Sequence, residues 1–206
     1  MEERQFAASL AREAGVIEDI RRSAWELHER VGQTYDETRP YGFHLSMVAD
    51  AAMHYGAPVV AGEDDVVPLL FGAWFHDSIE DARLTYNDVR RLASSFMTER
   101  QAHAAAEIVY ALTNDKGRTR AERAGEHYYA GIRTTPYAPL MKLCDRFANM
   151  SYSFRHGGNE PNSHMRDVYK AEWPHFLQAI DTRPTADMRL LLPPALTQAA
   201  QNLLAL

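Results

Sequence analysis

Residues 71–81 read FGAWFHDSIED, an apolar run that ends in one imidazole and three carboxylates. The apolar part is typical of a protein interior, where a charge is tolerated only if it is paired or bound to a metal. On an α-helix, side chains four residues apart lie on one face, so Glu80 would stack over His76 and Asp81 over Asp77. We therefore expect one helix wall to present a His/Asp pair and, a turn later, a Glu/Asp pair.

Four ionisable groups this close together repel one another unless a cation neutralises them. Imidazole nitrogens with carboxylate oxygens suit a divalent transition metal such as Mn, Fe, Co or Zn. The alternative is that His76 is a hydrogen-bonded core histidine and that the acids form a solvated helix face. Phe75 and Ile79 argue against this alternative, because both must be buried on the same short helix.

The remaining sequence predicts the fold class. The chain has 206 residues, of which 46% are hydrophobic and 24% charged, which fits one globular domain or at most two small ones. Apolar residues recur with helical periodicity almost everywhere, and the alternation typical of strands is nearly absent. The sequence therefore predicts an all-α protein, a single-domain helical bundle of about eight or nine helices over residues 1–206.

Helix boundaries are marked by capping residues, prolines and glycines. The predicted starts are Pro40 and the pairs Thr85 with Asp88, Thr98 with Gln101 and Thr119 with Glu122. The predicted stops are Gly56 with Pro58, the segment 114–117, and Gly157 with Gly158. After Thr182 the chain is rich in Leu, Ala and Pro, so we expect a closing helix packed on its own core, with an oligomer contact as the alternative.

Charge and cysteine content restrict the partners and the compartment. The formal net charge is -6 with acids and bases interspersed, which argues against polymeric nucleic acid as a partner. No apolar run approaches the ~20 residues of a membrane helix, and the N-terminus lacks a basic head followed by an apolar segment. The single cysteine, Cys144, excludes an internal disulfide framework, and its neighbour Asp145 disfavours a nucleophilic thiolate. We expect a cytoplasmic protein without a membrane partner.

Two further segments offer ligands for the same ion. His44 lies on an apolar-periodic helix, where a lone histidine is more often a core residue than a ligand. Asp145 lies beside a buried stripe, with Lys142 and Asn149 on its face at helical spacing, which indicates a polar cavity; a surface ion pair with Lys142 or Arg146 is the alternative. Together His44, His76, Asp77 and Asp145 form a two-nitrogen, two-oxygen set that leaves positions open for water and substrate.

The order His, His-Asp, Asp on an all-helical background resembles the HD-domain metal-dependent phosphohydrolases. More narrowly, HDSIED at 76–81 resembles the HDxxED element of the RelA/SpoT-type guanosine tetraphosphate hydrolases, including the small alarmone hydrolases and the metazoan SpoT homologue. AWELHERVGQ at 24–33 resembles the helix that ends in a GQ pair, PYGFHLSMVA at 40–49 the PYxxHPxxVA segment, and KLCDRFAN at 142–149 the KLxDRxxN segment. The resemblance covers roughly residues 20–155 and leaves 160–206 as a helical extension.

The resemblance implies a function and a role for each matched residue. It implies Mn²⁺ held by His44, His76, Asp77 and Asp145, water positioned or deprotonated by Glu80 and Asp81, and a nucleotide site lined by Asn149. It implies hydrolysis of the 3′-pyrophosphate of a guanosine or adenosine alarmone of the stringent response. The sequence departs from the family where Thr34 and Tyr35 follow Gln33 in place of basic residues, and where Leu45 replaces a proline. Those departures fall in the region expected to hold the base and its phosphates.

The chemistry is also reasonable without the resemblance. A divalent ion lowers the pKa of water and neutralises phosphoryl oxygens, and an acid that is not a ligand can accept the proton. We expect Glu80 to be the general base, with Asp81 orienting it or the water. Candidate cations for the remaining phosphates are Lys142, Arg146, Arg39 and the cluster Lys116, Arg118, Arg120 and Arg123, although the acids within that cluster equally fit a solvated helix face.

Two other functions remain open. One is an HD hydrolase acting on another nucleotide, such as a deoxynucleotide, a nucleoside monophosphate or nicotinamide adenine dinucleotide phosphate; HDxxED argues moderately against it. The other is a nucleotide-binding sensor without turnover, which has no need of the acid pair. The oligomeric state is open, with a homo-oligomer as one possibility.

Overall fold

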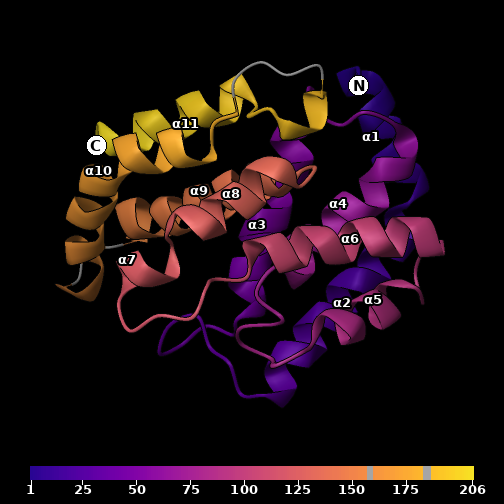
Figure 1. The fold of residues 1–206 in the computed structure, drawn as a ribbon, viewed down its shortest axis with the longest axis horizontal. Helices are drawn as coiled ribbons and strands as arrows, with labels where there is room; N and C mark the ends of the chain where they lie inside the picture. The colour runs from indigo at the N-terminus through magenta and orange to yellow at the C-terminus, as the bar shows by residue number, and fades with distance from the viewer. Residues whose placement is uncertain (157–159, 183–186) are drawn as a thin grey trace.

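The computed structural model describes residues 1–156, 160–182 and 187–206, and these residues form helices and no strand. The predicted all-α class is therefore confirmed (Figure 1). The α-helices are α1 (Glu3–Arg12), α2 (Ala14–Arg30), α3 (Gly42–Tyr55), α4 (Val66–Phe75), α5 (Tyr86–Ala93), α6 (Glu99–Leu112), α7 (Arg120–Arg123), α8 (Glu126–Thr134), α9 (Ala138–His156), α10 (Glu160–Ile180) and α11 (Pro194–Leu204). Two short 3₁₀ helices, Glu63–Asp65 and Met188–Leu190, join them.

The helices are slightly more numerous than the eight or nine predicted. Glu13 alone separates α1 from α2, and α7 has only four residues. A break of one residue leaves the apolar period almost unchanged, and a single turn is too short to show a period. Periodicity therefore cannot resolve these two boundaries.

The predicted capping residues begin three helices. Thr85, Thr98 and Thr119 are the N-caps of α5, α6 and α7, and each forms the expected capping box with the residue three positions later. α3 begins at Gly42, two residues after Pro40, and Gly56 is its C-cap. The stop predicted at Gly157 and Gly158 lies outside the described residues.

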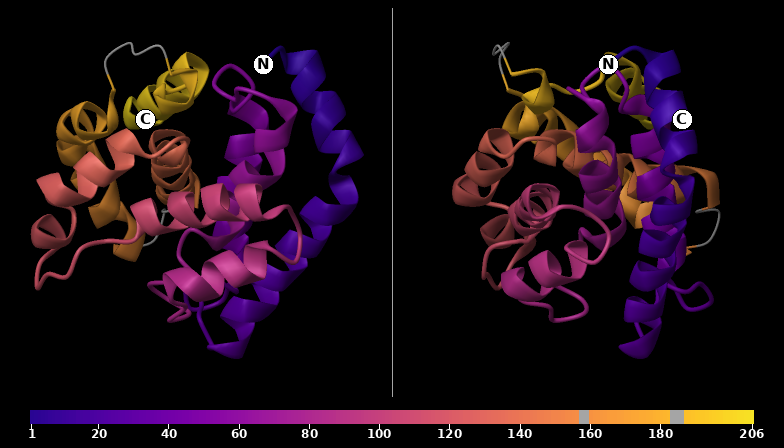
Figure 2. Two further views of the ribbon diagram at one scale, coloured as in Figure 1. Left: turned by 45° about the vertical axis from the view of Figure 1, so that its right-hand side comes forward. Right: turned by 90° about the vertical axis from the view of Figure 1, so that its right-hand side faces the viewer.

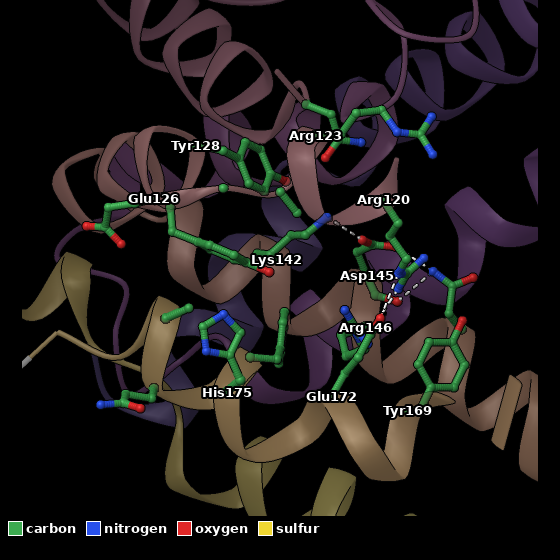
Figure 3. A pocket seen from close by; sticks show the side chains of 18 of the residues that line it. Arg120, Arg123, Glu126, Tyr128, Lys142, Asp145, Arg146, Tyr169, Glu172 and His175 are labelled. Atoms are coloured by element: carbon green, nitrogen blue, oxygen red, sulfur yellow. Dashed lines mark hydrogen bonds and ion pairs between the residues drawn. The ribbon is translucent and has the colours of Figure 1, made fainter. Parts of the chain in front are cut away.

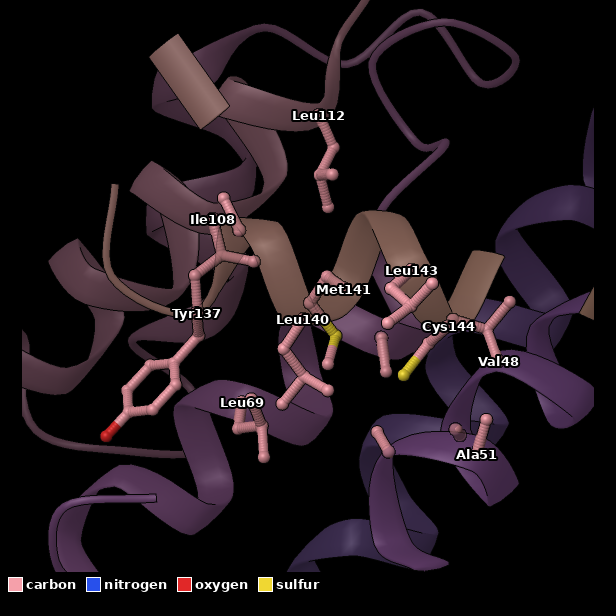
Figure 4. Packing of buried hydrophobic residues seen from close by; sticks show 14 of the residues in the cluster. Val48, Ala51, Leu69, Ile108, Leu112, Tyr137, Leu140, Met141, Leu143 and Cys144 are labelled. Carbon is pink, nitrogen blue, oxygen red and sulfur yellow. The ribbon is translucent and has the colours of Figure 1, made fainter. Parts of the chain in front are cut away.

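α9 is the central helix of the described structure, and it contacts α3, α6, α8, α10 and α11. Figures 1 and 2 show these helices gathered around it. Leu140, Met141 and Leu143 of α9 are fully buried, and in Figure 4 they lie among side chains from neighbouring helices, including Leu69 and Ile108. The polar flank of the same helix carries Asp145 and Asn149 toward a cavity.

Cys144 belongs to this core. Its side chain is fully buried, and burial raises the pKa of its thiol far above the ordinary value. A thiol that stays protonated is a poor nucleophile, which agrees with the apolar role predicted for it.

α4 is buried along its whole length, from Val66 to Phe75. It contacts α2, α3 and α6, and its close approach to α6 occurs at Gly72, where an added Cβ would lie 2.6 Å from a methyl carbon of Ile108. Because α4 packs against three helices, the position of its C-terminal end is fixed relative to them. α4 therefore places the residue that follows it, His76, in the interior.

The C-terminal helix packs on its own chain. α11 contacts α9, α10 and α3, and it buries Leu196, Ala200 and Leu203. These contacts agree with the expected packing of this segment on its own core. Within the described residues, the structure contains no helix that combines the length and the apolar character of a membrane span.

Candidate metal centre and cavity

The segment that follows α4 differs from the prediction. α4 ends at Phe75, and residues 76–81 form successive turns rather than one continuous helix. The ring Nδ1 of His76 lies 2.9 Å from the carbonyl oxygen of Ala73, an acceptor that a continuing helix would offer to the amide of residue 77. The predicted stacking of Glu80 over His76 on a regular helix is therefore wrong, although the amide of Asp81 still donates to the carbonyl of Asp77.

Three predicted ligands converge on one point in the interior. Nε2 of His44 and Nε2 of His76 lie 3.3 Å apart, and Oδ1 of Asp145 lies 3.4 Å from Nε2 of His44. One ligand atom from each of these three residues lies within 4.8 Å of the others. The exposed fractions of the two histidine side chains are only 2% and 3%, so both imidazoles are buried.

Asp77 borders this group of three. Its Oδ2 lies 2.8 Å from Nε2 of His76 and 3.7 Å from Nε2 of His44, and it accepts a 2.5 Å hydrogen bond from the hydroxyl of Tyr41. The structure thus brings all four predicted ligands together. Among the described residues, the three whose ligand atoms lie within 4.8 Å of one another are His44, His76 and Asp145.

The donor chemistry of the cluster fits a divalent cation. The Ala73 carbonyl can only accept, so Nδ1 of His76 carries the proton and Nε2 presents its lone pair to the cluster. A lone pair facing another imidazole and a carboxylate at these distances requires a proton or a cation between them. A metal-binding histidine usually donates its second nitrogen to a carbonyl in this way. The residues therefore fit a metal site, and the mixed nitrogen and oxygen ligands leave the metal itself undetermined.

The pKa shifts within the cluster also indicate a site for a cation. Burial by itself lowers the pKa of His76, but the charges of Asp77 and Asp145 outweigh it and raise that pKa to about 9. Despite burial, the two imidazoles and Lys142 hold the pKa values of Asp77 and Asp145 below the ordinary value. The cluster thus holds two carboxylates that stay ionised, and it binds a positive charge at the imidazole in the form of a proton.

Asp145 is held from two further sides. Nζ of Lys142 lies 3.1 Å from Oδ2 of Asp145, and Nδ2 of Asn149 donates to Oδ1 at 2.6 Å. Lys142 also lies 5.5 Å from the centre of the Tyr128 ring. Lys142 and Asn149, both predicted to bind substrate, therefore also hold a predicted ligand in place.

The predicted catalytic acids lie beside the cluster in different surroundings. The backbone amide of Asn114 donates to Oε1 of Glu80, and its side-chain amide donates to Oε2 at 3.2 Å. Burial and the charge of Asp77 raise the pKa of Asp81 to about 6. Neither acid is among the residues that line the cavity described next, whereas Asn114 is.

A cavity of about 1140 Å³ opens onto the cluster (Figure 3). Its wall includes Tyr41, His44, Asp77 and Asp145 on the cluster side, and residues of α7, α8 and α10 on the other side. The charged residues of the wall, apart from histidines, are the cations Arg120, Arg123, Arg133, Lys142 and Arg146 and the acids Asp77, Glu126, Asp145 and Glu172. Five cations face four acids, so a divalent ion in the cluster would make the wall clearly positive.

Most cations of the wall are already paired. Glu172 of α10 binds both Arg120, at 2.8 Å, and Arg146, at 2.7 Å, and Figure 3 shows these contacts across the cavity wall. Arg133 pairs with Glu126. Arg123 also lines the cavity, and its side chain makes no ion pair with another residue of the described chain, which leaves its guanidinium available to an anion.

The other predicted cations lie outside the cavity wall. Arg39 stacks over the ring of Phe43 at 4.7 Å and lies 3.5 Å from Oδ2 of Asp36. Lys116 and Arg118 are not among the lining residues either. Of the candidate substrate-binding residues, the structure thus places Asn149, Lys142, Arg146, Arg120 and Arg123 at the cavity.

Sequence reasoning missed several residues of the site, including Tyr41, Asn114 and Glu172. Tyr41 lies in the PYGFH segment, three residues before His44, and this helical spacing could have indicated that Tyr41 lies beside the metal site. Asn114 was noticed only as part of a helix stop. Glu172 has no local pattern that distinguishes it, because its two partners lie 26 and 52 residues away in the chain.

No protein-family model matches this chain, and a search of curated proteins finds no match either. The function is therefore inferred from the motifs and the geometry of the site.

Proposed function

We propose that the chain is a divalent-metal-dependent phosphohydrolase, with Mn²⁺ as the expected metal, that removes the 3′-pyrophosphate from a guanosine or adenosine alarmone. The observation that carries this proposal is the convergence of His44, His76 and Asp145 beside a large cavity, whose wall carries one more cation than acids and includes His44 and Asp145. The resemblance of HDSIED and the three other segments to RelA/SpoT-type hydrolases supplies the substrate class.

His44, His76 and Asp145, with Asp77 beside them, would hold the metal. Such an ion supplies Lewis-acid chemistry, since it lowers the pKa of water and neutralises phosphoryl oxygens. The chain contributes a preorganised setting for this chemistry. His76 is oriented by the Ala73 carbonyl, and Asp145 by Lys142 and Asn149.

The proton of the attacking water needs a separate acceptor. The best acceptor has a pKa near the working pH. Burial raises the pKa of both Glu80 and Asp81, and the carboxylate of Asp81, with a pKa of about 6, meets that condition. Both oxygens of Glu80 accept hydrogen bonds from Asn114, which suits an orienting residue better. We therefore assign proton transfer to Asp81 and positioning to Glu80, the reverse of the order expected from the sequence.

Binding of the substrate relies on the far side of the cavity. A nucleotide with several phosphates needs positive groups away from the reacting phosphate, and Arg123 is free to provide one. Arg120 and Arg146 both form ion pairs with Glu172. They still add positive charge to the wall, but this carboxylate competes with a phosphate for their guanidinium groups. The cavity volume of about 1140 Å³ is slightly above the usual range of small-molecule sites, about 300–1000 Å³, so the cavity has room for a large ligand.

The test is a substrate panel with metal-reconstituted protein. The panel contains 3′-pyrophosphorylated guanosine and adenosine nucleotides, deoxynucleoside triphosphates, nucleoside monophosphates and nicotinamide adenine dinucleotide phosphate, with products resolved by chromatography. We expect pyrophosphate, rather than two separate phosphates, from the 3′-pyrophosphorylated nucleotides. Faster cleavage of another nucleotide would reject the alarmone assignment and leave the metallohydrolase assignment intact.

One observation favours a second candidate, an HD-type hydrolase of a different phosphorylated nucleotide. No residue of the segment 31–40 is among those that line the cavity, although the family resemblance expects this region to hold the base and phosphates. The substrate panel separates the two hydrolases. Binding of a nucleotide without any turnover would instead favour a sensor.

A further inference from the structure

The two histidines of the cluster are held in different ways. His76 has a hydrogen bond from Nδ1 to the Ala73 carbonyl. Nδ1 of His44 is buried and has no hydrogen-bond partner in the described part of the chain. A ligand histidine without this outer hydrogen bond has no polar group to fix its ring plane. Another contact must orient His44.

Tyr35 makes that contact with its ring. The rings of Tyr35 and His44 are stacked, with their centres 5.0 Å apart and their planes inclined by 8°. Tyr41 packs edge-on against His44 from another direction, with a centre distance of 5.5 Å and an interplanar angle of 63°. Such aromatic pairs restrict rotation of the imidazole about its side-chain bonds.

The hydroxyl of Tyr35 is connected to a second predicted ligand, Asp145, through the side chain of Asn149. It donates to Oδ1 of Asn149 at 2.9 Å, and Nδ2 of the same amide donates to Oδ1 of Asp145 at 2.6 Å. The Asn149 amide can therefore have only one orientation, since its oxygen faces the hydroxyl and its nitrogen faces the carboxylate. One tyrosine thus links a ligand on α3 to a ligand on α9.

The segment that carries Tyr35 is itself fixed. The amide of Tyr35 donates to the carbonyl of Arg39 at 3.0 Å. Asp36 accepts hydrogen bonds from the amides of Thr38 and Arg39, both at 2.7 Å, and from the hydroxyl of Tyr152. A side chain on a fixed backbone can orient its neighbours at little entropic cost.

We propose that Tyr35 is a positioning residue that orients His44 by stacking and Asp145 through Asn149, and so sets the affinity and geometry of the metal site. The inference rests on the proposed metal-dependent function. It also gives a role to Tyr35 itself, which stands where the family that the sequence resembles usually has a basic residue. The ring of Tyr35 covers one face of the His44 imidazole. Substrate then reaches the cluster from the cavity side, where α7, α8 and α10 lie.

The experiment compares Mn²⁺ affinity and the visible absorption of the Co²⁺-loaded protein in three variants. Tyr35→Phe keeps the stack and loses the link to Asn149, whereas Tyr35→Leu loses both. Tyr137→Phe is the control, because the hydroxyl of Tyr137 is likewise hydrogen-bonded, to the Ala61 amide and to Asp65, but lies away from the cluster. We expect an affinity loss of about 10-fold for Tyr35→Phe and about 100-fold for Tyr35→Leu, the range typical of lost outer partners.

Two further readouts separate positioning from a general loss of stability. The Co²⁺ spectrum should change in both Tyr35 variants and stay unchanged in Tyr137→Phe, even if all three melt at lower temperatures. In an Asn149→Ala background, Tyr35→Phe should cause little further loss of affinity, because its hydroxyl acts through that amide.

The outcomes distinguish this inference from the proposed function. A wild-type protein that binds neither Mn²⁺ nor Co²⁺ would reject the proposed function. Wild-type affinity and spectrum in Tyr35→Phe, or a loss of affinity from Tyr35→Phe in the Asn149→Ala background as large as in the wild type, would overturn the inference and leave the metal site standing. Tyr35→Phe keeps the ring and its packing, so it tests the link from Tyr35 to Asn149 even if Tyr35→Leu does not fold.

Discussion

Asp77 and Asp81 stand four residues apart and meet opposite electrostatic surroundings. Although burial opposes it, the imidazole of His76 lowers the pKa of Asp77, whereas burial and the charge of Asp77 raise the pKa of Asp81 to about 6. A carboxylate that is always ionised suits a metal ligand, and one that titrates near neutral pH suits a proton acceptor. The two roles are therefore separated by surroundings rather than by residue type.

This separation predicts different losses in single variants. His76→Ala and Asp77→Ala should lose both metal and activity. Glu80→Gln and Asp81→Asn should keep the metal and the fold but slow turnover by roughly 10²- to 10⁴-fold, the usual loss when general acid-base help is removed. Metal content, substrate affinity and turnover number are measured on the same four purified variants.

Two results would count against this assignment. Metal loss from Glu80→Gln as severe as that from Asp77→Ala would mean that the second acid pair binds the ion directly. Near-normal turnover in both Glu80→Gln and Asp81→Asn would mean that the proton goes elsewhere, and the mechanism would have to be abandoned.

The raised pKa of His76 predicts how metal affinity depends on pH. The folded, metal-free protein holds a proton on His76 up to a pKa of about 9, and the metal must displace this proton because only neutral imidazole binds metal. Below pH 9, the logarithm of the affinity should therefore rise by about one unit per pH unit, with about one proton released per ion. Titration calorimetry in two buffers of different ionisation enthalpy measures the released proton. An affinity that does not change between pH 6.5 and 8.5 would show that His76 does not hold this proton in the metal-free protein.

At the scale of secondary-structure elements, the position of His76 depends on how α4 packs against α6. An added Cβ at Gly72 would lie 2.6 Å from Cγ2 of Ile108, and both residues are buried between packed helices. Gly72→Ala should therefore reduce the free energy of unfolding by about 1–3 kcal/mol, as overpacking usually does. Urea denaturation measures the change, and metal affinity reports whether the end of α4 has moved.

A second glycine gives the matched control. Gly15 lies near the start of α2 with no heavy atom within 4 Å of an added Cβ, so Gly15→Ala should stabilise the protein by about 0.5–1 kcal/mol. Equal effects of the two substitutions would show that contact with Ile108 does not set the α4 to α6 spacing.

The elements also show what the sequence could and could not predict. Helical periodicity and the capping boxes at Thr85, Thr98 and Thr119 are local, so they predicted the class and several boundaries. The end of α4 was not predictable, because it coincides with a side-chain bond from His76 to Ala73 that periodicity does not contain. The contact between Tyr35 and Asn149 joins residues 114 positions apart, and such pairs depend on tertiary packing.

At the scale of the whole molecule, the cluster joins distant parts of the chain. His44 is on α3, His76 follows α4 and Asp145 is on α9, and these parts meet in one hydrophobic core. An ion bound by all three binds the folded chain far better than an unfolded one. Metal binding should therefore stabilise the entire fold rather than one loop.

This coupling predicts a metal-dependent melting temperature. At a free Mn²⁺ concentration 100 times the dissociation constant, the stabilisation should be about 2.7 kcal/mol, which raises the Tm of a chain of this size by roughly 5–11 °C. A chelator should reverse the shift. Mg²⁺ should have a smaller effect, because it prefers oxygen ligands and the cluster offers two imidazoles. Thermal unfolding followed by circular dichroism measures each shift.

The decisive control is the same titration on His76→Ala, compared with Asp81→Asn. His76→Ala lacks one of the buried ligands, so its Tm should not respond to Mn²⁺ whatever its starting value. Asp81→Asn should keep the full response, because Asp81 is assigned to the proton and not to the ion. An equal Mn²⁺ response in wild-type and His76→Ala would place the bound ion elsewhere on the protein, and the cluster of His44, His76 and Asp145 would then have to be explained as a hydrogen-bonded core.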